Sequence, residues 1–126
     1  MGPYLIIAPL STLNNWKAEF QKWAPRIVVV SYTGTRDART DLWRGALRPG
    51  AFQVLLTTFE FIMNKHDMGN LSRVQWKYIV RTQNWTKTTR CARAVRAAAI
   101  VRASLLMSFY FALLLFLFRS STKVIA

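Results

Sequence analysis

The sequence predicts an α/β fold, a parallel β-sheet with flanking helices, followed by a helical hydrophobic tail. Short, continuous apolar runs recur through the first two-thirds of the chain, and segments of helical periodicity separate them. Such runs are typical of strands that are buried on both faces. Alternation of strands and helices at this spacing favours a parallel sheet with right-handed crossovers.

Four strands are expected from these apolar runs. They are residues 4–8, 27–30, 53–57 and 76–80. Pro9 ends the first run, and the segment 32–35 after the second reads as a turn. Each strand is therefore bounded by residues that favour a change of chain direction.

Helices are expected between the strands. In the first, Ser11 and Thr12 are the predicted N-cap residues, and Pro25 prevents continuation. Spacings of three and four residues predict one buried stripe, made of Leu13, Trp16, Phe20 and Trp23. A second helix is predicted over 36–47, with Ala38, Leu42 and Leu47 inward, and a third begins at 59–63.

The charge distribution divides the chain near residue 80. The net charge is +13, which usually indicates contact with phosphates or an anionic membrane face. Residues 1–80 hold ten Lys/Arg and all five acids, whereas residues 81–126 hold eight Lys/Arg and no acid. We interpret 81–126 as a basic, then hydrophobic, tail from an altered reading frame or exon. The single Cys91 excludes a disulfide within the chain, and no secretory signal is expected.

The tail has two physical features. Arg90, Arg93, Arg96 and Arg102 lie among alanines, which favour a helix. Residues 103–118 contain no charge, and this run is slightly short of the roughly 20 residues that span a bilayer. A possible transmembrane helix at about 103–118 therefore gives an alternative, a small tail-anchored membrane protein with a cytosolic α/β segment.

The candidate site lies where the strands end. In sheets of this kind the carboxyl ends of the strands carry the binding site. The segments there are 9–12, 32–35 and 57–60, which are rich in hydroxyls and in backbone N–H groups that open helices. This chemistry suits phosphate oxygens. The alternative, which composition alone favours, is that the hydroxyls only cap helices.

Five segments, in order, carry a resemblance to a known family. The segments occur at plausible spacing and are residues 2–16 (GPYLIIAPLSTLNNW), 19–25 (EFQKWAP), 32–39 (Tyr32, Gly34 and Arg39), 54–62 (VLLTTFEFI) and 71–80 (LSRVQWKYIV). They resemble motif Ia, the EF-x-KWAP helix, the Y-x-G-x-x-x-x-R segment, motif Ib and the strand leading into motif II of SWI/SNF-family helicase-like chromatin-remodelling ATPases, with the Brahma type most similar.

The resemblance implies that residues 1–80 are part of a RecA-like helicase ATP-binding lobe. Its parent would be a nuclear motor that uses ATP and magnesium to move along DNA and reposition nucleosomes. By motif, the residues beside the DNA backbone would be Pro9, Leu10, Ser11, Thr12, Gly34, Thr57 and Thr58. This implication replaces the preference for simple capping, while Trp16, Phe20 and Trp23 are expected in the core.

The sequence also departs from the family's pattern. The 126 residues contain no phosphate-loop pattern, and Arg81 follows Val80 where the family has its acidic DEGH box. The second lobe has no counterpart here. We therefore expect no catalytic residue, no metal ligand and no ATP hydrolysis by this chain. His66 and Asp67 are expected in a solvated polar loop without a third partner.

Overall fold

The computed structural model describes residues 3–81 and 97–102. The elements in chain order are β1 (Tyr4–Ile7), α1 (Leu10–Trp23), β2 (Val29–Tyr32), α2 (Arg36–Arg44), β3 (Val54–Thr57), α3 (Phe59–Met63), α4 (Lys65–Leu71), β4 (Trp76–Arg81) and β5 (Ala97–Arg102). The strands form one sheet in the order β2-β3-β1-β4-β5, and every pair is parallel. The expected parallel α/β architecture is confirmed.

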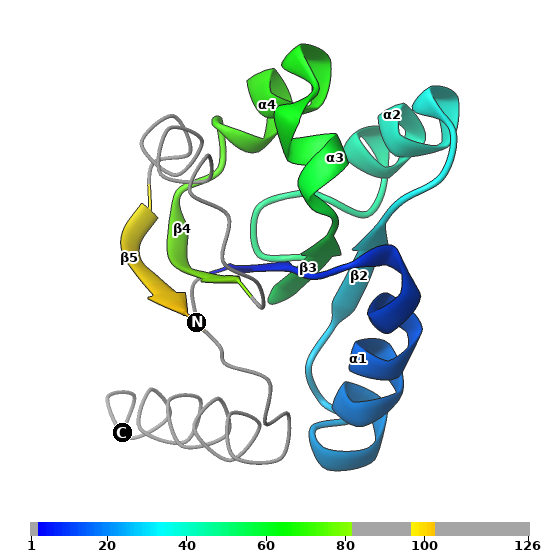
Figure 1. The fold of residues 1–126 in the computed structure, drawn as a ribbon, viewed down its shortest axis with the longest axis vertical. Coiled ribbons are helices and arrows are strands. Elements are labelled where there is room, and N and C mark those ends of the chain that lie inside the picture. Colours follow the sequence, from blue (N-terminus) through cyan, green and yellow to red (C-terminus); the bar gives the residue numbers. More distant parts are fainter. Residues whose placement is uncertain (1–2, 82–96, 103–126) are drawn as a thin grey trace.

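Helices cover both faces of the sheet (Figure 1). Helix α1 lies below the sheet in this view, and α2, α3 and α4 lie above it. Strands β1 and β3 are wholly buried because their side chains alternate between the two covered faces. This explains why the sequence shows continuous apolar runs rather than alternation of apolar and polar residues.

Two hydrophobic clusters hold the layers together. The cluster on the α1 face contains Tyr4, Ile6, Ala8, Leu13, Trp16, Phe20, Val54, Leu56 and Val80. The cluster on the opposite face contains Leu5, Ile7, Tyr32, Leu47, Phe52, Leu55, Ile62, Leu71, Trp76 and Ile79. Alternate residues of β1 enter the two clusters, Tyr4 and Ile6 on one face and Leu5 and Ile7 on the other, so this strand is the centre of the packing.

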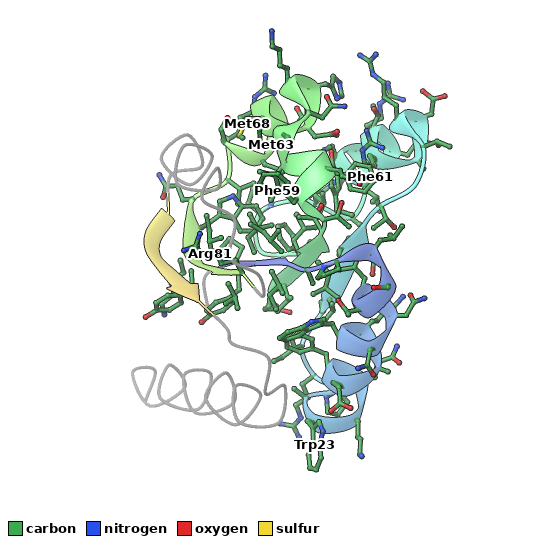
Figure 2. The ribbon with its side chains drawn as sticks, in the orientation of Figure 1. Trp23, Phe59, Phe61, Met63, Met68 and Arg81 are labelled. Carbon is green, nitrogen blue, oxygen red and sulfur yellow. The ribbon has the colours of Figure 1, made fainter. Side chains whose placement is uncertain are left out.

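Helix α1 differs from the prediction at both ends. It begins at Leu10 with Pro9 as its N-cap, and no side chain caps it. The predicted capping by Ser11 and Thr12 is wrong, because the Thr12 hydroxyl instead donates a hydrogen bond to the Pro9 carbonyl at 2.9 Å. At the other end Trp23 is 55% exposed and points away from the sheet (Figure 2), so its expected core position is also wrong. Its indole N–H bonds Glu19 Oε2 at 2.8 Å.

The second strand and helix are shifted relative to the prediction. Strand β2 runs to Tyr32, so this residue belongs to the strand rather than to a turn. Helix α2 ends at Arg44, and Leu47 is buried beyond it. Ala38 is exposed, and Arg39 is the buried residue of this helix. The prediction placed an alanine inward because an unpaired arginine is expected to stay in water.

An additional strand lies beyond β4. Residues Ala97–Arg102 form β5, which pairs with β4 from Trp76↔Ala97 to Arg81↔Arg102. The predicted helical preference of this alanine-rich stretch is wrong here, because pairing with an open sheet edge overrides intrinsic propensity. The hydrophobic stretch 103–118 lies outside the described residues. Within the described part, no helix has the length and apolarity to cross a bilayer.

Candidate nucleic-acid interface

The carboxyl ends of the strands are aligned in one row. The register pairs Ile7 with Thr57 and Arg81, and it pairs Thr57 with Tyr32. A backbone bond of 3.0 Å from the Ala8 N–H to the Thr57 carbonyl continues the pairing beyond β1. The segments that follow these strands therefore open at the same edge of the sheet, as predicted for the candidate site.

The amino end of α1 forms one part of this edge. Leu10 is 67% exposed and Ser11 is exposed, while Pro9 and Thr12 are half-buried. The Thr12 N–H and hydroxyl both bond the Pro9 carbonyl, at 3.0 and 2.9 Å. Amides in the first turn of a 14-residue helix carry positive partial charge toward the solvent at its end. These features suit an anionic group.

The two threonines at the end of β3 have different environments. Thr57 is fully buried, and its hydroxyl donates a 3.2 Å hydrogen bond to the Tyr32 carbonyl. Thr58 is 5% exposed, and its Oγ1 has no hydrogen-bond partner among the described residues. A buried hydroxyl without a partner is costly. Thr57 therefore joins β3 to β2, whereas Thr58 holds an unused hydroxyl beside the edge.

Gly34 lies two residues beyond the end of β2. Its φ of +95° is a backbone conformation that residues with a side chain rarely adopt. The residue is exposed, and its carbonyl accepts a 2.6 Å hydrogen bond from Arg39 Nη1. The bend between β2 and α2 is therefore fixed from inside the protein while its outer side is open to solvent.

Arg39 belongs to a buried polar network with Tyr32 and Asp67. Arg39 Nε and Nη2 bind Asp67 Oδ1 and Oδ2 at 3.0 and 2.9 Å, and the Tyr32 hydroxyl donates to Oδ1 at 2.5 Å. The Trp43 indole N–H donates to the Tyr32 oxygen at 2.9 Å. Asp67 is fully buried in α4, so the expectation of a solvated loop without a third partner is wrong for this residue.

The network shifts the protonation equilibria of its members. Burial by itself would raise the pKa of Asp67, but hydrogen bonds from Arg39 and Tyr32 outweigh it and lower that pKa. Burial, followed by the hydrogen bond to Asp67, raises the pKa of Tyr32 to about 12. The hydrogen bonds to Asp67 raise the pKa of Arg39 despite its burial. Asp67 is therefore ionised and Tyr32 neutral at physiological pH.

The described residues do not fit a magnesium–nucleotide complex. They contain no group of three or more His, Cys, Asp or Glu side chains that could hold a metal ion. Asp67, the buried carboxylate, is occupied by Arg39, and β4 ends in Arg81 rather than in an acid.

Two features of the site are not predictable from local sequence patterns. Arg81 was assigned to the tail, but it is the last residue of β4 and lies in the same row as Ile7 (Figure 2). Arg102 follows it in register on β5, so two arginine positions adjoin along the edge. The apolar run 76–80 gave no signal that the strand continued. The second missed feature is Asp67, for which the spacing from Arg39 offers no local pattern.

The order and direction of the strands, with helices on both faces, define part of a RecA-like α/β lobe. Residues 1–91 match the SNF2-related domain family, and the chain belongs to that family. The sequence-based identification of a SWI/SNF-type ATPase fragment is confirmed.

Individual relatives show the same likeness. The chain is 51% identical over 80 residues to ATP-dependent helicase brm of Drosophila melanogaster, covering 64% of this chain and 5% of that protein. It is 44% identical over 79 residues to transcription regulatory protein SNF2 of Saccharomyces cerevisiae, covering 63% and 4%. The chain thus spans about a twentieth of these relatives.

Solved structures show the same fold. The Sulfolobus solfataricus SWI2/SNF2 ATPase core in complex with dsDNA superimposes with a TM-score of 0.61 at 24% identity. The alignment covers 81% of this chain and 21% of that one. The likeness at this identity establishes the shared fold.

Proposed function

We propose that residues 1–80 act as part of the first lobe of an ATP-dependent DNA translocase that remodels chromatin in the nucleus, and that their strand-end edge holds the DNA backbone. The observation that carries the proposal is the exposed amino end of α1, where Leu10 and Ser11 face solvent. It lies at the same edge as the exposed Gly34 bend and as Thr58, whose buried Oγ1 has no partner among the described residues. Hydroxyls and amides so placed can hold phosphate oxygens without reading base sequence.

The contacts divide by exposure. Leu10, Ser11 and Gly34 are exposed, so they would meet the backbone directly. Pro9 ends β1 and starts the helix, and the Thr12 hydroxyl fixes that turn. Thr58 would contribute its hydroxyl, and Thr57 would hold β3 and β2 in place through its bond to the Tyr32 carbonyl. The names of the matched relatives and structure support this assignment, because they include a helicase and a complex with double-stranded DNA.

The same proposal assigns no ATP hydrolysis to this chain. In the full-length relatives ATP and magnesium would be bound by motifs that these 126 residues do not contain. Beyond β4, residues 82–126 would be a basic, then hydrophobic, tail, of which Ala97–Arg102 pair with β4 as an additional strand. The membrane alternative depends on residues 103–118, which the structure does not describe.

A salt series of DNA binding tests the proposal. We expect the chain to bind a DNA duplex of arbitrary sequence, roughly three helical turns long, at low salt. Affinity should fall as the salt concentration rises, because contacts to phosphates release counterions. Ser11→Ala should weaken binding several-fold, whereas Ser72→Ala, the same change beyond α4, should not. Absence of binding at low salt, or equal effects of the two variants, would refute the proposal.

The proposal that this chain does not hydrolyse ATP has its own test. Purified chain should not release phosphate from ATP above the rate of a boiled sample, with or without DNA. Turnover that Ser11→Ala or Thr57→Val abolishes would contradict the assignment.

A further inference from the structure

Arg39 and Asp67 stand apart from the residues proposed to touch DNA. Their side chains are 7% and 0% exposed, and their charged groups bind partners inside the protein. Removing two charges from water is expensive, and a buried ion pair can often be replaced by apolar residues without loss of stability. Stability alone therefore does not account for a charged pair at this position.

The guanidinium of Arg39 has three separate anchors. Two of its nitrogens hold both carboxylate oxygens of Asp67 on α4, and the third, Nη1, holds the carbonyl oxygen of Gly34 at 2.6 Å. The ring of Phe61 on α3 lies 4.3 Å from the guanidinium carbon, which fixes the plane of the group. Figure 2 shows Phe61 on the side of α3 that faces α2.

The bond to Gly34 determines where the next amide points. No described peptide bond is cis. In a trans peptide the N–H points opposite to the C=O. Because Arg39 draws the Gly34 carbonyl inward, the N–H of Thr35 in the same peptide points away from Arg39, toward the outer side of the bend. The Thr35 side chain is already used, since its hydroxyl accepts the Ala38 N–H at 3.3 Å.

Asp67 also reaches the strand ends. Its Oδ1 accepts the Tyr32 hydroxyl, and the carbonyl of Tyr32 accepts the Thr57 hydroxyl. One carboxylate on α4 therefore holds the end of β2, the bend after it and, through Tyr32, the end of β3. The candidate edge is positioned by a residue that lies 33 positions beyond Gly34 in the chain.

From this geometry we propose that Arg39 and Asp67 are positioning residues that aim the Thr35 amide at the DNA backbone. The inference rests on the proposed function, because it adds a donor to the same interface. It predicts a phosphate contact at Thr35, a residue outside the set of DNA contacts that the family resemblance implies. Arg39 is suited to this task because its planar fork can hold a carboxylate and a carbonyl together, which a lysine cannot do.

Amide chemical shifts during a DNA titration test this inference. In the unchanged chain, duplex DNA should shift the backbone amides of both Ser11 and Thr35. Arg39→Lys keeps a positive charge beside Asp67 but loses the bond to Gly34, so the Thr35 shift should disappear while the Ser11 shift persists. DNA affinity should fall about tenfold, as expected for one hydrogen bond to a charged group. Arg44→Lys on the exposed side of α2 is the matched control and should change neither shift.

A second variant separates positioning from stability. Replacing both members of the pair, Arg39→Met with Asp67→Leu, removes both buried charges and should keep the chain folded. It should also abolish the Thr35 shift. A Thr35 shift that survives in the folded Arg39→Lys chain or in the folded double variant would overturn the inference alone. Loss of all DNA-induced shifts in the unchanged chain would overturn the proposed function and this inference together.

Discussion

Arg39 and Asp67 form a two-point ion pair that joins α2 to α4, with Nε–Oδ1 and Nη2–Oδ2 distances of 3.0 and 2.9 Å. Both side chains are buried, in contrast to Arg44 and Asp41, whose side chains are more than 70% exposed at a separation of 3.6 Å. Helix α2 thus contributes an arginine to a buried pair and both members of an exposed pair, so the contributions of the two pairs can be compared.

We predict that Asp67→Asn lowers the free energy of unfolding by about 3–5 kcal/mol, because it leaves Arg39 charged and uncompensated inside the protein. Urea denaturation, followed by tryptophan fluorescence, measures the change. Asp41→Asn is the matched control and should leave the midpoint unchanged, since exposed pairs contribute little. Equal effects of the two substitutions would show that the buried network does not stabilise the fold.

Alkaline pH should destabilise the protein through Tyr32. Its pKa is raised from 10.0 to about 12 in the folded chain, so folding favours the neutral phenol. The corresponding stability is fully present below pH 10 and is lost as the pH rises from about 10 toward 12. Stability measured across this range should decline less steeply in Tyr32→Phe. A residual slope is expected in that variant, because burial and Tyr78 also raise the pKa of Tyr4.

Acid should act through Asp67 in the opposite direction. Its folded-state pKa lies below the ordinary value of 3.8, so its contribution is present above pH 3.8 and is lost as the pH falls through the lower, folded-state pKa. The double replacement of Arg39 by Met and Asp67 by Leu should therefore flatten the acid limb of the stability curve. An unchanged acid limb would contradict the assigned ionisation of Asp67.

Thr57 at the end of β3 and Thr58, which precedes α3, should respond differently to the same substitution. Thr57→Val removes a buried hydrogen bond to the Tyr32 carbonyl and should cost about 1 kcal/mol. Thr58→Val removes a buried hydroxyl that has no partner within the described part of the chain, so thermal stability should be unchanged or increased. Thr58→Val should nevertheless weaken DNA binding. If it destabilised the fold as much as Thr57→Val does, its hydroxyl would not be available to a ligand.

The two tryptophans of α1 should differ in importance. Trp16 is 2% exposed and packs against β1 and β3, so Trp16→Ala should cost about 3–5 kcal/mol. Trp23 is 55% exposed at the far end of the helix, and Trp23→Ala should cost much less. Thermal unfolding of the two variants measures the difference. Similar losses of stability in the two variants would show that Trp23 contributes to the core as Trp16 does, as the sequence-based stripe predicted.

The sheet could be predicted from the sequence because strands that are covered by helices on both faces have a recognisable local composition. β1 and β3 are buried on both faces, so residues 4–7 and 54–57 appear as uninterrupted apolar runs. The predicted buried stripe of α1 is correct as far as Phe20 and wrong at Trp23, where the helix extends beyond the sheet. Periodicity records which face of a helix is inward but not where the partner surface ends.

The network around Asp67 has no local pattern in the sequence. Its partners Tyr32 and Arg39 lie 35 and 28 residues away, and nothing near Asp67 in the sequence marks it as buried. A charged residue in a short polar stretch favours solvent unless a partner is known. β5 was missed for a related reason, because an alanine-rich strand is recognisable only from the edge with which it pairs.

Photocrosslinking to duplex DNA identifies which end of the sheet contacts the nucleic acid. A photoreactive phenylalanine analogue placed at position 11 should crosslink to DNA at low salt, and the same residue at position 75, before β4 at the opposite end of the sheet, should not. Crosslinking at position 75 but not at position 11 would contradict the claim that the strand-end edge holds the DNA backbone.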